Sequence, residues 1–160
     1  MRLLLAVQLQ TEHYLKLNKN MKRTQTILMS VFVGLLTISI LWVILAETGV
    51  IETGQFAMNA QQEFLQVAVM EIATLGSVFL ALRLFKFKAI HKELVEQKEQ
   101  ALLKWGLIRL VLLELPMLSN TLFYYQFMNT TFGYMAIIQL LCLPFVVPTM
   151  GRCLAEVEEE

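Results

Sequence analysis

The sequence predicts an all-α integral membrane protein: a bundle of four transmembrane helices whose N-terminus and C-terminus both lie in the cytoplasm. Of its 160 residues, 57% are hydrophobic and 16% are charged, whereas about 25% of the residues of a soluble domain are charged. The hydrophobic residues gather in four blocks, each close to the roughly 20 residues with which a helix crosses a bilayer. All thirteen acidic residues are glutamate, which forms helices more readily than aspartate does.

Residues 1–25 are predicted to form a cytoplasmic N-terminal segment, followed by a first span over residues 26–46. The apolar core of the segment covers only residues 3–7, which is too short for a span or for the core of a signal peptide. We interpret it either as a disordered extension or as a stretch that precedes a true start at Met21. The span that follows carries no charged residue.

Three further spans are predicted at residues 65–85, 105–127 and 132–150, so that residues 26–150 form a single membrane domain. The charged connection at residues 86–104 has neither glycine nor proline, and its apolar residues recur near helical spacing. It is predicted either to extend the two spans that it joins or to form a short amphipathic helix at the cytoplasmic surface. Residues 151–160 are predicted to be an acidic cytoplasmic tail.

The orientation follows from lysine and arginine residues in short loops, which favour the cytoplasmic side. Five precede the first span: Arg2, Lys16, Lys19, Lys22 and Arg23. Six lie between the second and third spans: Arg83, Lys86, Lys88, Lys92, Lys98 and Lys104. The loops at residues 47–64 and 128–131 have none. Because segments with positive charges alternate along the chain with loops that have none, all the positive segments lie on one side, and both termini are predicted to be cytoplasmic.

Composition and spacing also exclude several classes of function. The formal net charge is zero, so no overall positive field attracts nucleic acid. Cys142 and Cys153 would lie about 16 Å apart on a continuous helix, beyond the reach of a disulfide. There is no Cys-x-x-Cys motif, and His13 and His91 are isolated. We therefore predict no disulfide, metal, cofactor or nucleic-acid partner, and expect the lipid bilayer to surround the chain.

The third predicted span contains Glu114, about 13 Å from its cytoplasmic end. An acid at the bilayer centre costs about 2.5–3.5 kcal/mol on insertion scales and usually faces protein or water. Glu114 is too short to reach the headgroups, so we expect it inside the bundle, protonated and donating to a freed carbonyl or to Ser77. Arg109 lies closer to the cytoplasmic edge and is expected to extend its side chain to the headgroups.

Glu71, Asn120 and Gln139 belong to the second, third and fourth spans, and each lies about 9–11 Å below the outer face. Their common depth predicts that they meet inside the bundle. For these three residues and Glu114, three interpretations stay open. They hold the helices together through hydrogen bonds worth about 0.6 kcal/mol each, they line a small polar cavity with a proton site, or they form an interface with another chain.

Three prolines, Pro116, Pro144 and Pro148, are predicted to break the helices of two spans, because each removes one backbone hydrogen bond. Pro116 frees the carbonyl of Leu112 in the third span. Pro144 and Pro148 leave a weakened helix at the cytoplasmic end of the fourth. With its acid, arginine and proline, the third span is expected to insert only when it pairs with a neighbouring span.

No nucleotide, thiol or nucleophile motif occurs in the sequence, so we expect a protein that is not an enzyme. The first hypothesis is a subunit or accessory protein of the prokaryotic inner membrane, acting through helix association with a second copy or another membrane protein. The second is a small proton-coupled transporter that uses Glu114 and Glu71. The third is a membrane-embedded enzyme that acts on lipid, for which no His–acid or Ser–His pair lies at the interface.

Overall fold

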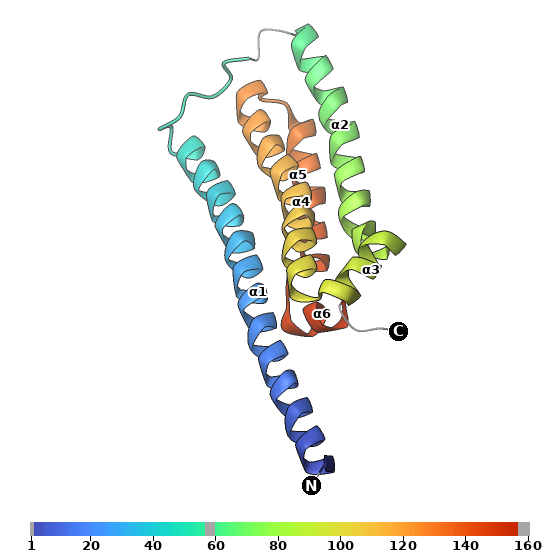
Figure 1. The fold of residues 1–160 in the computed structure, drawn as a ribbon. Coiled ribbons are helices and arrows are strands. Elements are labelled where there is room, and N and C mark those ends of the chain that lie inside the picture. The colour runs from blue at the N-terminus through green and yellow to red at the C-terminus, as the bar shows by residue number, and fades with distance from the viewer. Residues whose placement is uncertain (1, 57–59, 157–160) are drawn as a thin grey trace.

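Every described element of the chain is a helix, as the computed structural model of residues 2–56 and 60–156 shows (Figure 1). The elements in chain order are α1 (Arg2–Glu47), α2 (Ala60–Arg83), the short 3-10 helix η1 (Leu84–Lys86), α3 (Lys88–Gln97), α4 (Glu99–Phe127), α5 (Thr130–Cys142), the 3-10 helix η2 (Leu143–Phe145) and α6 (Met150–Ala155). No strand occurs in these two ranges. The all-α part of the predicted fold class is confirmed.

Two stretches of the described chain are long and apolar enough to cross a membrane. They are Lys19–Glu47, within α1, and Ala60–Lys86, which comprises α2 and η1. The apolar stretch Thr130–Phe145 is shorter. The helix α4 is not one of the two, and charged and amide side chains interrupt its apolar sequence. A membrane location is therefore supported by two helices and not by four.

The helices α1, α2, α4 and α5 run alternately up and down, and α4 lies at the centre in contact with the other three (Figure 1). The N-terminus, α3 and α6 lie at one end of this arrangement, which we call the α3 end (Figure 1). The loops that join α1 to α2 and α4 to α5 lie at the opposite end, the loop end (Figure 1). The helix α4 therefore connects the elements on either side of it.

The helices α1 and α4 lie parallel and keep one register over most of their common length. At the α3 end Asn20 Nδ2 donates to Glu99 Oε1 over 3.1 Å, a pair separated by 79 positions. At the loop end Tyr125 Oη donates to Glu47 Oε1 over 2.8 Å, a pair separated by 78 positions. Any residue of α4 therefore lies level with the α1 residue about 78 positions before it.

Close approach of α1 to α4 depends on Gly106. A Cβ atom at this position would lie 2.9 Å from Leu28 Cδ1 of α1, which is shorter than real side-chain contacts. Both Gly106 and Leu28 are buried. The missing side chain thus lets the backbone of α4 come near α1 at the α3 end.

The N-terminal segment differs from the prediction. The helix α1 begins at Arg2 and continues into the predicted first span, so the expectation of a disordered segment is wrong from Arg2 onward. No glycine or proline occurs before Gly34, and the leucine, lysine and glutamine residues there favour helix. The first turns of α1 extend beyond the other helices, whereas Met21 is fully buried against them (Figure 1).

The charged connection at residues 86–104 contains a separate helix, α3, which is the second of the two predicted arrangements. Ile90 and Leu94 are buried on one face of α3. Glu93 accepts hydrogen bonds of 2.9 Å from Lys104 Nζ and from Trp105 Nε1 of α4. The hydrogen bond from Lys104, and to a smaller extent the one from Trp105, holds the pKa of Glu93 below its ordinary value. The two contacts fasten α3 to the start of α4.

The helix breaks predicted at the prolines have different outcomes. The helix α4 runs through Pro116 without a break, so the predicted break there is wrong: one backbone bond is lost, and the helices around α4 hold it in place. The fourth predicted span is interrupted, because α5 ends at Cys142 and Pro144 lies in η2. Pro148 lies in the extended stretch before α6. Of the predicted acidic tail, residues 157–160 lie outside the described residues.

Substitution of Gly106 by leucine is expected to lower the free energy of unfolding by about 1–3 kcal/mol, because the new side chain overlaps Leu28 and forces α1 away from α4. Gly34→Leu is the matched control, since nothing lies within 4 Å of a Cβ atom built there. Thermal unfolding in mild detergent measures both variants. Equal melting temperatures for the two would contradict the close α1–α4 contact.

Candidate functional site

Asn120 is the centre of a buried hydrogen-bond network that joins α4 to α2 and α5. Its Nδ2 donates to Thr74 Oγ1 over 2.8 Å and to Gln139 Oε1 over 3.0 Å. Gln139 Nε2 in turn donates to Ser77 Oγ over 3.4 Å and to the carbonyl of Leu113 over 3.5 Å. Asn120 and Gln139 are fully buried. Their predicted meeting is confirmed, and the network has the geometry of a contact that holds three helices together.

Glu71 does not join this network, although the sequence predicted that it would. Its side chain is exposed on α2. The buried residues of that helix are Met70, Thr74, Ser77 and Ala81, and Glu71 lies about 100° around the axis from Met70. Thr74, which the sequence analysis did not select, takes the place expected for Glu71. Glu71 lies within one turn of Thr74 along α2, but rotation about the helix axis turns it away from α4.

Glu114 is buried on α4, with only 1% of its surface exposed. Neither of its carboxyl oxygens has a hydrogen-bond partner in the described part of the chain. The expected bond to Ser77 is absent, because the Ser77 hydroxyl donates to the carbonyl of Thr74 over 2.9 Å. The interpretation of Glu114 as a hydrogen-bonding contact between helices is therefore wrong. It is buried, yet it joins nothing.

Glu114 faces α1 rather than α2. It lies on a stripe of α4 with Leu110, Met117 and Thr121, whose spacing of four, three and four positions keeps them on one side of a helix. Leu110 shares a cavity with Leu28 of α1, and Met117 and Thr121 line a groove with α1 residues. The register of 78 positions places Glu114 level with Leu36. The acid is thus buried in the contact between α1 and α4.

The groove beside this stripe lies between α1, α4 and α5 and has a volume of about 260 Å³. Its lining includes Leu36, Ser39 and Val43 of α1, Met117 and Thr121 of α4, and Ile137 of α5. The two hydroxyl groups bond to their own helices, Ser39 Oγ to the Leu35 carbonyl over 3.1 Å and Thr121 Oγ1 to the Met117 carbonyl over 2.9 Å. The free surface of the groove is therefore apolar. We call it the α1–α5 groove.

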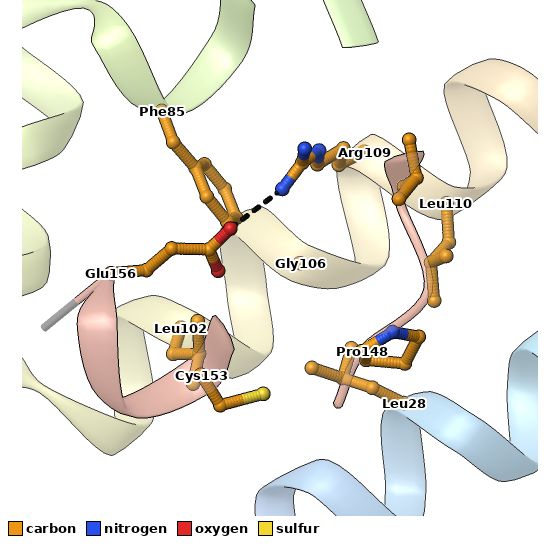
Figure 2. Close-up of a pocket in the computed structure, with 10 residues that line it drawn as sticks. Leu28, Phe85, Leu102, Gly106, Arg109, Leu110, Pro148, Cys153 and Glu156 are labelled. Carbon is orange, nitrogen blue, oxygen red and sulfur yellow. Dashed lines mark hydrogen bonds and ion pairs between the residues drawn. The ribbon is translucent and has the colours of Figure 1, made fainter. Parts of the chain in front are cut away.

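Arg109 binds protein groups at the α3 end instead of extending outward, so the expectation that it would reach the headgroups is wrong. Its Nη1 forms an ion pair of 2.8 Å with Glu156 Oε1, as Figure 2 shows. Its Nε donates to the carbonyl of Ala81 over 3.0 Å, and its Nη2 to that of Phe145 over 3.3 Å. The guanidinium also stacks 4.7 Å from the ring centre of Phe85. One side chain thereby joins α4 to α2, η1, η2 and the residue after α6.

The ion pair borders a cavity of about 20 Å³, the size of one water molecule (Figure 2). Cys153 of α6 lines the same cavity and is buried. Burial, and then the nearby carboxylate of Glu156, raises the pKa of the Cys153 thiol to about 11. Burial also raises the pKa of Glu156 and outweighs the opposing effect of Arg109. Cys142 and Cys153 are both free thiols.

The described side chains include no group of three or more histidine, cysteine, aspartate or glutamate residues that could hold a metal ion. The positions of Asn120, Gln139 and Glu114 along their spans predicted that these residues are buried in the bundle. The parts that Thr74 and Glu156 play in the contacts were not predicted. A threonine in an apolar helix carries little signal of its own, because its hydroxyl commonly bonds to its own helix. The partner of Arg109 was missed because the fourth span was expected to continue as a helix.

The sequence matches no protein-family model, and no curated protein or solved structure is significantly similar to it.

Asn120→Leu is expected to lower the free energy of unfolding by about 1–3 kcal/mol, because it leaves Thr74 and Gln139 without a buried partner.

Glu114→Leu is expected to be at least as stable as the wild type, because no hydrogen bond is lost and a buried polar group is removed. Thermal unfolding in detergent measures both changes. A Glu114→Leu protein that is clearly less stable, while Glu114→Gln is tolerated, would show that Glu114 has a bonding partner after all.

Arg109→Gln is expected to speed alkylation of Cys153 by about tenfold or more, because α6 loses its ion pair with α4 and opens more often. In the intact protein at pH 7.5, a pKa about two units above the ordinary 9.0 leaves roughly a hundredfold less thiolate to react. The rate is measured with N-ethylmaleimide in a Cys142→Ser background. Lys92→Gln, which removes an exposed ion pair of α3, is the control and should leave the rate unchanged. An unchanged rate in Arg109→Gln would mean that other contacts hold α6 closed.

Proposed function

We propose that the chain is a four-span protein of the prokaryotic inner membrane, with both termini in the cytoplasm, that acts as a non-enzymatic subunit or accessory protein. In this proposal it associates through its helices with a second copy of itself or with another membrane protein. The alternating charges of the loops support the orientation. A fluorescent-protein fusion to the C-terminus, which matures only in the cytoplasm, tests it and should be bright.

The packing of α4 supports its proposed place as a span. Its polar side chains would oppose insertion of an isolated helix. In the fold, Arg109 and Asn120 bond to neighbouring elements, and Glu114 is buried. Protein therefore shields from lipid the groups that lower the hydropathy of α4. The helix α5 together with η2 is shorter than an average span, and α6 closes the bundle below it.

The exposed position of Glu71 is the observation that supports the proposed association with another chain. Glu71 lies on a helix that is long and apolar enough to cross a membrane. Its neighbours Ile72 and Leu75 are 76% and 64% exposed, and Glu71 has no ion pair or hydrogen bond in the described part of the chain. A carboxyl group that faces lipid is costly and calls for a polar partner. A helix of another chain that offers a hydrogen-bond donor at this depth would provide one.

The association is tested by comparing the wild type with Glu71→Leu in lipid nanodiscs and mild detergent. Native mass spectrometry is expected to find the wild type as an oligomer or in a stoichiometric complex, and Glu71→Leu mainly as a monomer. Glu71→Gln, which keeps a hydrogen-bonding group, should retain most of the association. Glu52→Leu removes an acid from the exposed loop and serves as the matched control.

A wild-type chain that is monomeric in both media and isolates with no partner would contradict the proposed function. A complex that persists in Glu71→Leu would contradict the part assigned to Glu71 and leave association through another face. The wild-type chain is a monomer in the first result and part of a complex in the second, so the wild type alone distinguishes the two.

A further inference from the structure

Glu114 is an acid without a counter-charge. No salt bridge or hydrogen bond to its carboxyl oxygens occurs in the described residues, and only 1% of its surface is exposed. Arg109 is the nearest cationic residue along α4, and its guanidinium is already shared among Glu156 and two backbone carbonyls. Buried charged or polar groups are normally paired, and an unpaired one asks for an explanation. The described part of the chain therefore offers no group that would neutralise this carboxylate.

The apolar α1–α5 groove begins one turn above Glu114. Met117 lines the groove and lies about 4.5 Å further along the axis of α4 than Glu114. Leu36, which is level with Glu114 by the register of α1 and α4, also lines it. Glu114 is not part of the lining; Met117 is the lining residue of α4 that lies nearest to it along the helix. The methionine side chain is unbranched, has three rotatable bonds and adapts its shape readily.

The two features together specify a kind of ligand. Since its hydroxyl groups bond to their own helices, the groove offers surface to a hydrocarbon or aromatic body and no hydrogen bonds. The acid at its end offers a single negative charge in a site that excludes water, where an opposite charge is attracted strongly. An uncharged lipid chain fills the groove but leaves Glu114 unpaired, and an anion is repelled. A ligand with an apolar body and a positive charge satisfies both.

We propose that the α1–α5 groove and Glu114 form a binding site for a lipophilic cation. The apolar body lies in the groove against α1, α4 and α5, and the positive charge pairs with the Glu114 carboxylate as the Met117 side chain adapts its shape. Binding at this site does not use Glu71 or the outward face of α2, so it is independent of the proposed association. In the empty site the Glu114 carboxyl carries a proton, and binding of the cation releases this proton.

The experiment measures binding of tetraphenylphosphonium to the full chain in lipid nanodiscs by equilibrium dialysis. Tetraphenylborate, which has the same shape and the opposite charge, is the matched ligand. The wild type is expected to bind the cation and not the anion. Glu114→Gln should weaken binding of the cation by roughly tenfold to a hundredfold, the effect of losing a bond to a charged group. Glu96→Gln makes the same change on the exposed face of α3 and should leave binding unchanged.

A second variant tests the groove while leaving the acid in place. Ala136 lines the groove on α5, and Ala136→Phe is expected to fill part of it and to weaken binding of the cation by about tenfold. This variant also keeps the test valid if Glu114→Gln fails to fold, which circular dichroism and thermal unfolding check.

Three results would overturn the proposal. The first is no saturable binding of tetraphenylphosphonium to the folded wild type. The second is equal binding of the cation to the wild type and to folded Glu114→Gln, which would place the ligand elsewhere. The third is equal binding of the cation and the anion, which would identify the groove as a site for an uncharged hydrocarbon chain.

Discussion

The structure depends on one constraint: the polar side chains of α4 must be surrounded by other helices. Arg109 and Asn120 lie on the side of α4 that faces α2, about 20° apart around the helix axis, and Glu114 lies on the side that faces α1. Each is covered by a different set of elements, with α2, η2 and α6 around Arg109, α1 over Glu114, and α2 with α5 at Asn120. A central α4 is the arrangement that covers all three, and it explains why the remaining helices contact α4 more than they contact one another.

The three residues nevertheless differ in the number of hydrogen-bond partners that they have. Arg109 and Asn120 each reach several partners, so they fasten the α3 end and the middle of the bundle. Glu114 gains nothing from its burial, because both of its oxygens are unpaired. A buried polar group that is not bonded costs about 1–3 kcal/mol in proteins, and leucine at the same place would avoid this cost. A feature that lowers stability and lies beside an apolar groove points to a task other than folding.

The helix that covers Glu114 has polar contacts to the rest of the bundle near its two ends. Asn20 and Gln25 fasten α1 at the α3 end, and Glu47 fastens it at the loop end. Between these points α1 and α4 pack mainly through apolar side chains such as Leu28 and Leu110, and the two helices approach closely at Gly106. Apolar surfaces slide or separate in lipid with less loss than hydrogen-bonded ones, because lipid replaces the contact. The side of the bundle closed by α1 is therefore better suited to opening than the side closed by α2 and α5.

The sequence by itself determined that the chain is helical and where most helices lie, because apolar blocks, missing glycine and proline, and charged connections act locally. It also determined the depth of the polar residues, since each position of a helix advances the chain by a constant rise. Only the tertiary structure decided which of them meet. A difference of one position turns a side chain by about 100°, so Thr74 faces Asn120 while Glu71 faces outward. Likewise, Glu156 met Arg109 only because the chain turns back after Cys142, a contact between distant residues that no local pattern contains.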